Sequence, residues 1–214
     1  MTHPPPTPPP VDRRRRRNPQ ATRDRLVRAA LDLFTTQGYH DTTTPQIARR
    51  AGVAEGTIYR HFESKEHLLN EIYRAGVRRF QRSVTEGPGA VPCEQRLAAI
   101  AEAWRQLAAR DAALVRMVVG RRFAGLLDER SRQAAADLRH ALGAVIASGK
   151  AAGSIRSGNA ETWAEVWYQL VSLTLDRIAA GEWKPHDAAP DLVTRAAWDA
   201  IRASAAAGQD RAAE

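Results

Sequence analysis

The stretch from Thr42 to Lys65 carries polar and aromatic side chains for which a protein core has no use. Ile58 and Phe62 are spaced to point inward from one helix, whereas the polar residues around them face other ways. Arginine, glutamine and glutamate side chains can hydrogen-bond the edges of guanine, adenine and cytosine, respectively. The chemistry that this stretch supports is therefore recognition of base pairs through hydrogen bonds.

Two short helices joined by a tight turn are needed to position these side chains. Thr44 can cap the first helix, and Pro45 suits its first position, where a missing N–H costs nothing. Gly52 ends this helix because glycine permits a left-handed turn. A second helix is expected from about Glu55 to His61, after Ala54, which offers no side-chain oxygen as a cap. The pattern predicts a helix-turn-helix, whose second helix enters a DNA major groove.

The same residues carry a family resemblance. The run Thr57-Ile-Tyr-Arg-His-Phe62, followed by Ser64-Lys-Glu and Leu68, resembles the signature of the TetR family of bacterial transcription regulators, and the resemblance covers roughly residues 22–72. It implies contacts with the DNA backbone or bases for Thr43, Thr44, Thr57, Tyr59, His61 and Lys65. It implies reading of base identity for Pro45, Gln46, Glu55, Gly56 and Arg60.

Individual side chains in this set suggest specific base contacts. Arg60 could read guanine and Gln46 could read adenine. Gly56 would let the helix backbone approach the groove closely. Glu55 has two interpretations, because its carboxylate could accept a hydrogen bond from cytosine or could pair with Arg49 or Arg60.

The first twenty residues are rich in proline and arginine. Six of the first ten residues are proline, which predicts a disordered, extended arm over residues 1–20. Five consecutive arginines less Asp12 give this arm +4 of the net charge of +8. Those arginines are Arg13, Arg14, Arg15, Arg16 and Arg17. They favour contact with phosphates or the minor groove, and the alternative is a solvated tail.

The rest of the chain is alanine-rich and lacks the alternation of strands, so the predicted fold class is all-α, with about nine helices. We expect an N-terminal three-helix DNA-binding domain at residues 21–66, a larger helical effector-binding and dimerisation domain at 67–207, and a tail at 208–214. Besides the helix-turn-helix pair, the expected helices are 22–37, 64–84, 93–109, 111–126, 129–149, 160–180 and 187–206.

The helix at 64–84 is expected to connect the two domains as one rigid lever. Ser64 can cap its start with the hydroxyl group. Lys65 follows in the first turn, where the positive end of the helix dipole disfavours a cation. A nearby DNA phosphate would explain the lysine, which is also the role that the family resemblance implies.

The helix at 160–180 is apolar on more than one face, which is wider than a surface helix needs. In the TetR family the last two long helices pair with their copies, so the resemblance implies a homodimer on a palindromic operator. The alternative is a monomer in which this helix is the central core helix. The candidate interface residues are Leu170, Val171, Thr174, Ile178, Val193, Ala197 and Ile201.

An apolar cavity in the second domain could hold a small-molecule effector. Five tryptophans beside only four phenylalanines suggest that the effector is aromatic or apolar. Arg105 or Arg121 could steer a polar end, although ordinary core packing is the alternative for the apolar candidates. The apolar candidates are Trp104, Leu107, Met117, Phe123, Trp163 and Trp167.

Several other classes of protein receive no support from the sequence. It contains no metal-ligand spacing, no glycine-rich phosphate loop and no nucleophile with a matched histidine and acid, so we expect no cofactor and no enzyme. No apolar run approaches membrane-spanning length, and the start lacks a signal-peptide pattern. With Cys93 as its single cysteine, the chain is expected in a reducing cytoplasm.

The leading hypothesis is a ligand-responsive transcription regulator, most simply a repressor that leaves its operator when a small molecule binds. One alternative is a non-specific DNA-compacting protein, which the basic arm would permit. Residues 21–70 carry seven basic and six acidic side chains, a net charge of +1, which favours selective binding instead. A helical enzyme is the other alternative.

Overall fold

The computed structural model describes residues 19–87 and 91–204. Within these residues the chain forms eight α-helices and two 3₁₀ helices, and strand-like pairing is limited to one bridge between Ile155 and Arg202. The elements are α1 (Pro19–Thr36), α2 (Thr44–Arg50), η1 (Glu55–Arg60), α3 (Lys65–Thr85), α4 (Cys93–Arg110), α5 (Ala112–Val119), η2 (Arg121–Leu126), α6 (Glu129–Ala151), α7 (Ala160–Ala179) and α8 (Ala188–Ile201). The expected all-α fold class is confirmed.

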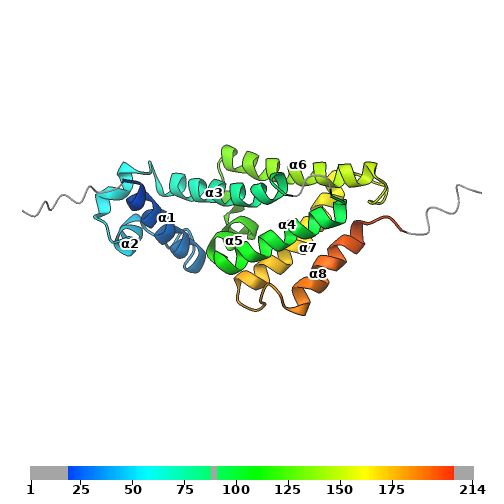
Figure 1. Ribbon diagram of the computed structural model, residues 1–214. Helices are drawn as coiled ribbons and strands as arrows, with labels where there is room; N and C mark the ends of the chain where they lie inside the picture. Colours follow the sequence, from blue (N-terminus) through cyan, green and yellow to red (C-terminus); the bar gives the residue numbers. More distant parts are fainter. Residues whose placement is uncertain (1–18, 88–90, 205–214) are drawn as a thin grey trace, which may run out of the picture.

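The molecule is elongated, with a small head and a larger body (Figure 1). We define the head as residues 19–64, which contain α1, α2 and η1, and the body as residues 91–204, which contain α4 to α8. Figure 1 shows α3 running from the head into the body, where it lies beside α6. This continuous helix of 21 residues is the lever that the sequence predicts.

The head is held together by apolar side chains from all of its helices and from the start of α3. Leu26 and Phe34 of α1, Ile47 of α2, Ile58 of η1 and Leu68 of α3 are all buried. Their burial is the main source of stability for so small a unit, because each buried aliphatic or aromatic side chain contributes roughly 1.5–3 kcal/mol. The head's polar surface is therefore carried on a fixed frame.

The head differs from its prediction at two helix boundaries and in the type of one helix. The cap of α2 is Thr43 rather than Thr44, because the Thr43 side chain accepts from the Gln46 N–H and the Gln46 side chain accepts from the Thr43 N–H. The second helix of the motif is a 3₁₀ helix, which suits a segment of only six residues without a side-chain cap at Ala54. Helix α1 already begins at Pro19, so the expected arm lies in residues 1–18, outside the described residues.

In the body, the helix expected at 111–126 is divided at Gly120 into α5 and η2. Gly120 has an extended backbone, with φ −71° and ψ 136°. A Cβ atom at this residue would lie 2.5 Å from the carbonyl oxygen of Arg116, so the break depends on glycine. The prediction of one unbroken helix through Gly120 is therefore wrong.

Helix α7 is the central helix of the body, packed against α4, α5, α6 and α8. Helix α8 ends earlier than expected, at Ile201, because Arg202 leaves the helix to pair with Ile155. The expected tail at 208–214 lies outside the described residues. Together these helices enclose a core that continues into the head along α3.

Candidate nucleic-acid interface and ligand cavities

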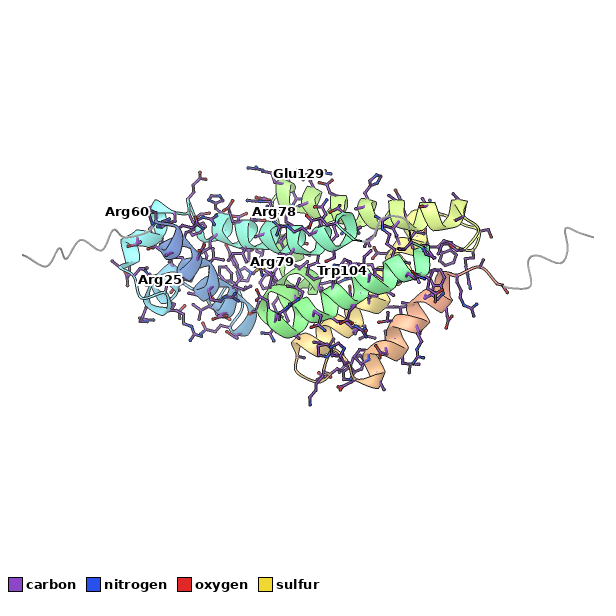
Figure 2. The ribbon with its side chains drawn as sticks, in the orientation of Figure 1. Arg25, Arg60, Arg78, Arg79, Trp104 and Glu129 are labelled. Atoms are coloured by element: carbon purple, nitrogen blue, oxygen red, sulfur yellow. The ribbon has the colours of Figure 1, made fainter. Side chains whose placement is uncertain are left out.

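The segment from Glu55 to His61 presents an exposed polar edge above a buried apolar one. Ile58 and Phe62 are each 2% exposed, whereas Tyr59 is 61% exposed and Arg60 also faces solvent. Arg60 lies at the head end of the molecule, away from the body (Figure 2). The eleven residues predicted to bind DNA from the helix-turn-helix all lie on α2, on η1 or at the ends of α2, η1 and α3.

Two of the predicted DNA-binding residues join the two helices of the motif. The hydroxyl groups of Thr44 and Tyr59 lie 3.0 Å apart and form a hydrogen bond between α2 and η1. Gln46 uses its side-chain oxygen in the α2 cap, at 2.7 Å from the Thr43 nitrogen. In the free protein these groups therefore orient one another, and any contact with DNA would use their remaining hydrogen-bonding capacity.

Lys65 has protein partners that were not predicted. Its ammonium group donates to the carbonyl oxygens of Tyr39 at 2.8 Å and Thr42 at 2.7 Å, and it lies 4.2 Å from the centre of the Tyr39 ring. These contacts tie the turn before α2 to the start of α3. The cation at this helix end is thus explained without a phosphate, so the helix dipole no longer supports a DNA contact at Lys65.

Glu55 makes no ion pair with any residue that the structure describes. The alternative in which it pairs with Arg49 or Arg60 is therefore not observed. Gly56 beside it is exposed, and a Cβ atom there would meet nothing within 4 Å. This part of η1 is open to solvent and sterically free to approach a flat or grooved partner.

A hollow of about 500 Å³ lies between the start of α1 and the segment from Gly52 to His61. Arg25, Thr57, Arg60 and His61 line it together, and the guanidinium group of Arg25 lies next to Gly52. Figure 2 shows Arg25 and Arg60 at the same end of the molecule. Arg25 was not among the predicted residues, although its position on the polar face of α1 was a usable signal. Arg13 to Arg17 lie outside the described residues.

Four of the six apolar residues predicted to bind the effector are core residues instead. Trp104, Met117, Phe123 and Trp167 are at most 2% exposed, and none of them lines a described cavity. Trp104 donates from Nε1 to the Phe80 carbonyl oxygen at 3.1 Å and packs on Trp167, with 5.8 Å between ring centres. The prediction that these side chains line a pocket is corrected, because neighbouring helices already fill the space around them.

Three other residues of that prediction also lie elsewhere. Arg105 bridges α4 and α8 through Asp191 at 2.5 Å, and it also pairs with Glu102 at 2.6 Å. Trp163, near the start of α7, donates from Nε1 to the Ser157 carbonyl oxygen at 3.1 Å. Leu107 is half-buried against the core. Of the eight predicted pocket residues, Arg121 alone lines a cavity among the five described.

Two adjoining cavities occupy the side of the body formed by α3, α5, η2, α6 and α7. The α6–α7 cavity has a volume of about 470 Å³, and the α3–α7 cavity has a volume of about 610 Å³. Arg139, Glu165 and Tyr168 line both of them. The wall of the larger cavity is formed by Tyr73, Val77, Val118, Val119, Gly120, Arg121, Ala124, Leu127, Arg132, Ala135, Leu138, Arg139, Glu165, Tyr168 and Gln169.

Two tyrosines of the larger cavity have altered acidity. Burial raises the pKa of the Tyr73 hydroxyl, and the neighbouring Tyr168 raises it further, whereas Arg139 acts in the opposite direction. Burial also raises the pKa of Tyr168, against the opposing effects of a hydrogen bond with Ser172 and of the charge of Arg139. Both hydroxyls are therefore neutral at pH 7 and available as hydrogen-bond donors.

Five of the seven predicted interface residues are enclosed within one protomer. They are each at most 5% exposed because α7 and α8 pack their apolar sides against each other and against the rest of the body. Leu170 and Val193 are half-buried and keep some exposed surface. The five residues removed from the predicted interface are Val171, Thr174, Ile178, Ala197 and Ile201.

An ion-pair cluster connects the head directly to the body. Asp111, between α4 and α5, is 8% exposed and accepts hydrogen bonds at 2.9 Å from Arg28 of α1 and from Arg79 of α3. Figure 2 places Arg79 where α3 passes from the head towards the body. The start of α5 is thus fixed to the head, while its end, at Val118 and Val119, forms part of the larger cavity.

The described residues contain no group of three or more histidine, cysteine, aspartate or glutamate side chains placed to hold a metal ion. Among their helices, none combines the length and apolar character needed to cross a membrane. The described residues place an exposed polar edge on the head and the α6–α7 and α3–α7 cavities in the body.

Comparison with known proteins separates the head from the body. The family model for bacterial regulatory proteins of the tetR family matches residues 26–72. The HTH-type transcriptional regulator SrpR of Pseudomonas putida is 45% identical over 53 residues, which cover 25% of this chain and 25% of SrpR. The HTH-type transcriptional regulator TcmR of Streptomyces glaucescens is 50% identical over 52 residues, covering 24% of this chain and 23% of TcmR. The match thus spans about a quarter of these relatives' length.

The fold similarity extends over the body as well. The crystal structure of a bacterial regulatory protein in the tetR family from Rhodococcus superposes with a TM-score of 0.71. The sequences are 22% identical, and the match covers 86% of this chain and 98% of that chain. The sequence match to the head and the shared fold of head and body confirm the resemblance found in the sequence. Residues 26–72 are thus similar in sequence to bacterial regulatory proteins of the tetR family, and head and body together share the fold of a solved member of that family.

Proposed function

We propose that this protein is a ligand-responsive transcriptional repressor that binds a palindromic operator as a homodimer and releases it when a small molecule binds. The observation that carries the proposal is the exposed edge from Gly56 to Arg60, held in place by the buried Ile58 and Phe62. The family match at residues 26–72 includes this edge, and the two relatives compared above are named as transcriptional regulators. A short helix with an exposed polar edge fits a major groove.

The proposed dimer face lies on the outward sides of α7 and α8. Among the described residues, three large apolar side chains are exposed: Tyr59 on the head, Leu173 at 45% and Leu192 at 64%. Leu170 on α7 and Val193 on α8 are half-buried and extend this apolar surface. Pairing of two copies through these residues would cover them and place two heads on successive turns of one DNA duplex.

Release of DNA would follow from a ligand in the body that favours one spacing of the two heads. Helix α3 is continuous between the head and the cavity wall, and α5 connects that wall to the head through Asp111. A ligand that fits the cavity better in one arrangement of α3 and α5 shifts the population towards it. The two binding sites would then be linked, and each ligand would weaken binding of the other.

Selection of DNA by the purified full-length protein tests the proposal. Sequencing the fragments that it retains should reveal two inverted half-sites whose centres lie about 10 base pairs apart, or a multiple of that distance. Fluorescence anisotropy should then show much tighter binding to the selected site than to a scrambled duplex of the same length and composition. Equal affinity for both duplexes would contradict the proposal and favour a DNA-compacting protein.

The predicted role of the arginine arm can be tested on the selected operator. Replacing Arg13 to Arg17 with glutamine keeps the length of the chain and removes five positive charges. If the arm binds DNA, the dependence of log Kd on log salt should become shallower by about 0.9 for each phosphate that the arm no longer neutralises. An unchanged salt dependence would identify the arm as a solvated tail.

A further inference from the structure

The α3–α7 cavity combines an apolar interior with an excess of positive charge. Val77, Val118, Val119, Leu127 and Leu138 contribute aliphatic surface from α3, α5, the segment before α6, and α6. Its charged wall residues are three arginines and one glutamate. A cavity of this composition suits a molecule with an apolar body and a localised charge of opposite sign.

The hydrogen bonds of the wall residues show which charges remain available. Arg132 pairs with Glu129 at 2.8 Å, so its charge is already compensated. Glu165 accepts a hydrogen bond from Gln169 at 2.6 Å. In contrast, Arg121 and Arg139 make no hydrogen bond or ion pair with any of the residues that the structure describes. Two guanidinium groups without a partner among these residues therefore face this cavity.

The hydroxyl groups of two tyrosines add further hydrogen-bond donors to the cavity wall. Tyr73 and Tyr168 line the cavity close enough to Arg139 for its charge to affect the acidity of both hydroxyls. Neutral hydroxyls can donate to an anionic oxygen, and guanidinium groups donate to carboxylate, phosphate or sulfonate with favourable geometry. A cation in this place would instead meet two guanidinium groups and only one carboxylate, that of Glu165.

We propose that the α3–α7 cavity binds an organic anion, with the apolar body among the aliphatic side chains and the anionic group contacted by Arg139 and Arg121. This inference rests on the proposed function in one respect, namely that the cavity is the effector site. It goes beyond that function by naming the charge class of the effector. It also replaces the predicted tryptophan pocket with a different set of residues.

Isothermal titration calorimetry with matched probes tests the charge class directly. One set consists of naphthylacetate, naphthylacetamide and naphthylethylammonium, which share an aromatic body and differ in the charge of the head group. The second set consists of decanoate, decanol and decyltrimethylammonium. In at least one set the anion should bind the full-length protein at least about tenfold more tightly than the neutral and cationic members. The absence of this preference in both sets would overturn the proposal.

Variants at the two free guanidinium groups locate the site. Arg139→Gln should weaken binding of the preferred anion by about tenfold, and Arg121→Gln should weaken it by a smaller factor. Arg130→Gln is the matched control, because Arg130 is exposed on the same helix and lies outside the wall of this cavity. Thermal unfolding of each variant should match that of the wild type, since Arg139 and Arg121 hold no other described residue in place. Equal affinities for Arg139→Gln and Arg130→Gln would overturn the assignment.

The calorimetry is done without DNA, so its result does not depend on whether an operator exists. Operator binding is then measured by anisotropy with and without the preferred anion. Anion binding that fails to release the operator would contradict the ligand-responsive repressor, but it would leave the anion site established. Operator binding without any anion preference would overturn the anion site and leave the DNA-binding function intact.

Discussion

The head and the body of this molecule place their functional side chains by different physical means. In the head, caps, turns and a short helix leave Tyr59 and Arg60 on the surface, above the buried Ile58 and Phe62. In the body, the cavity wall is assembled from α3, α5, η2, α6 and α7, which are distant in the sequence. The head is therefore a locally specified surface, and the body is a product of how its helices pack.

This difference predicts that substitutions in the two regions act independently unless they touch the connection between them. A change on the exposed edge of η1 removes contacts with DNA and leaves the body's core as it was. A change in the cavity wall alters ligand binding and leaves the head's surface intact. The connection consists of α3 and the cluster of Asp111 with Arg28 and Arg79.

The largest effect on DNA binding is expected for Arg60→Ala. Loss of one bidentate hydrogen-bonded pair with guanine costs about 1–3 kcal/mol, and the dimer loses two, so affinity for the operator should fall about 30-fold or more. Calorimetry with the preferred anion should give the wild-type affinity, because Arg60 is on the head. Anisotropy with Arg78→Ala provides the control, since Arg78 is exposed on α3 near the body (Figure 2). Equal operator affinities for the two variants would remove Arg60 from the interface.

Replacing Asp111 with asparagine should break the independence of the two regions. The variant loses a buried charge that accepts from two arginines, so the free energy of unfolding should fall by about 1–3 kcal/mol. We also expect the anion to reduce operator affinity less than in the wild type, because α5 is no longer fixed to α1.

Asp191→Asn is the control for this coupling. Asp191 pairs with Arg105 within the body, so its loss should lower stability without changing the effect of the anion on operator affinity. Urea unfolding followed by circular dichroism gives the stability of both variants, and anisotropy at several anion concentrations gives the coupling. Coupling of wild-type size in Asp111→Asn would show that α3 alone connects the two sites.

A glycine-to-alanine substitution can be made both in the body and in the head, and the two should affect stability differently. In the body, a Cβ atom at residue 76 would lie 2.6 Å from Val118 Cγ2 and 3.1 Å from Leu114 Cδ1. Gly76→Ala should therefore lower the free energy of unfolding by about 1–3 kcal/mol, since valine has little rotamer freedom with which to move away. In the head, a Cβ atom at residue 56 would meet nothing within 4 Å.

Gly56→Ala should consequently keep or raise stability, by at most about 1 kcal/mol, because alanine restricts the unfolded chain. Its operator affinity should nevertheless fall several-fold if the backbone of η1 approaches the groove closely. Thermal unfolding and anisotropy measure the two effects separately. If Gly56→Ala lowered the stability and left the operator affinity unchanged, the backbone of η1 would not approach the groove at this residue.

The sequence predictions are more accurate for the head, which is specified locally, than for the body, which depends on how the helices pack. Gly52 was expected in a left-handed turn and has φ +67°, and Ser64 was expected to cap α3 and accepts from the His67 N–H at 2.9 Å. Both predictions succeed because a turn or a cap is determined within a few residues. The errors in the head are small: the cap of α2 is off by one residue, the start of α1 by three, and η1 differs in helix type.

In the body, the sequence specified the helices but not the partners of their faces. The broad apolar surface of α7 was assigned to a second protomer, whereas Val171 and Thr174 are buried by the protomer's own helices. The tryptophans were assigned to a pocket, whereas Trp104 and Trp167 pack on each other. Helical periodicity shows which residues share a face and carries no information on which neighbour covers that face.

The smallest predicted effect concerns two helix caps, one in the head and one in the body. The loss of stability on replacing each cap should depend on pH differently in the two regions. The Thr43 cap of α2 is local and uncharged, so Thr43→Ala should cost about 0.5–2 kcal/mol at every pH. The Asp128 cap of α6 also depends on another helix. The Asp128 carboxylate accepts from the Ser131 N–H at 2.7 Å within α6 and from Arg74 of α3 at 2.9 Å. Its replacement by asparagine should therefore have a cost that depends on pH.

The direction of that dependence follows from the acidity of Asp128. Burial alone would raise its pKa, but the hydrogen bonds from Ser131 and Arg74 outweigh burial and hold the pKa below its ordinary value. A lowered pKa means that the carboxylate stabilises the folded protein fully above its unfolded pKa and loses this effect as the pH falls through the folded one. Urea unfolding should thus show a constant difference between wild type and Asp128→Asn near neutrality and a shrinking difference below about pH 4. A difference as insensitive to pH as that of Thr43→Ala would show that the Arg74 contact adds nothing to the cap, and that α6 starts by the same local rule as α2.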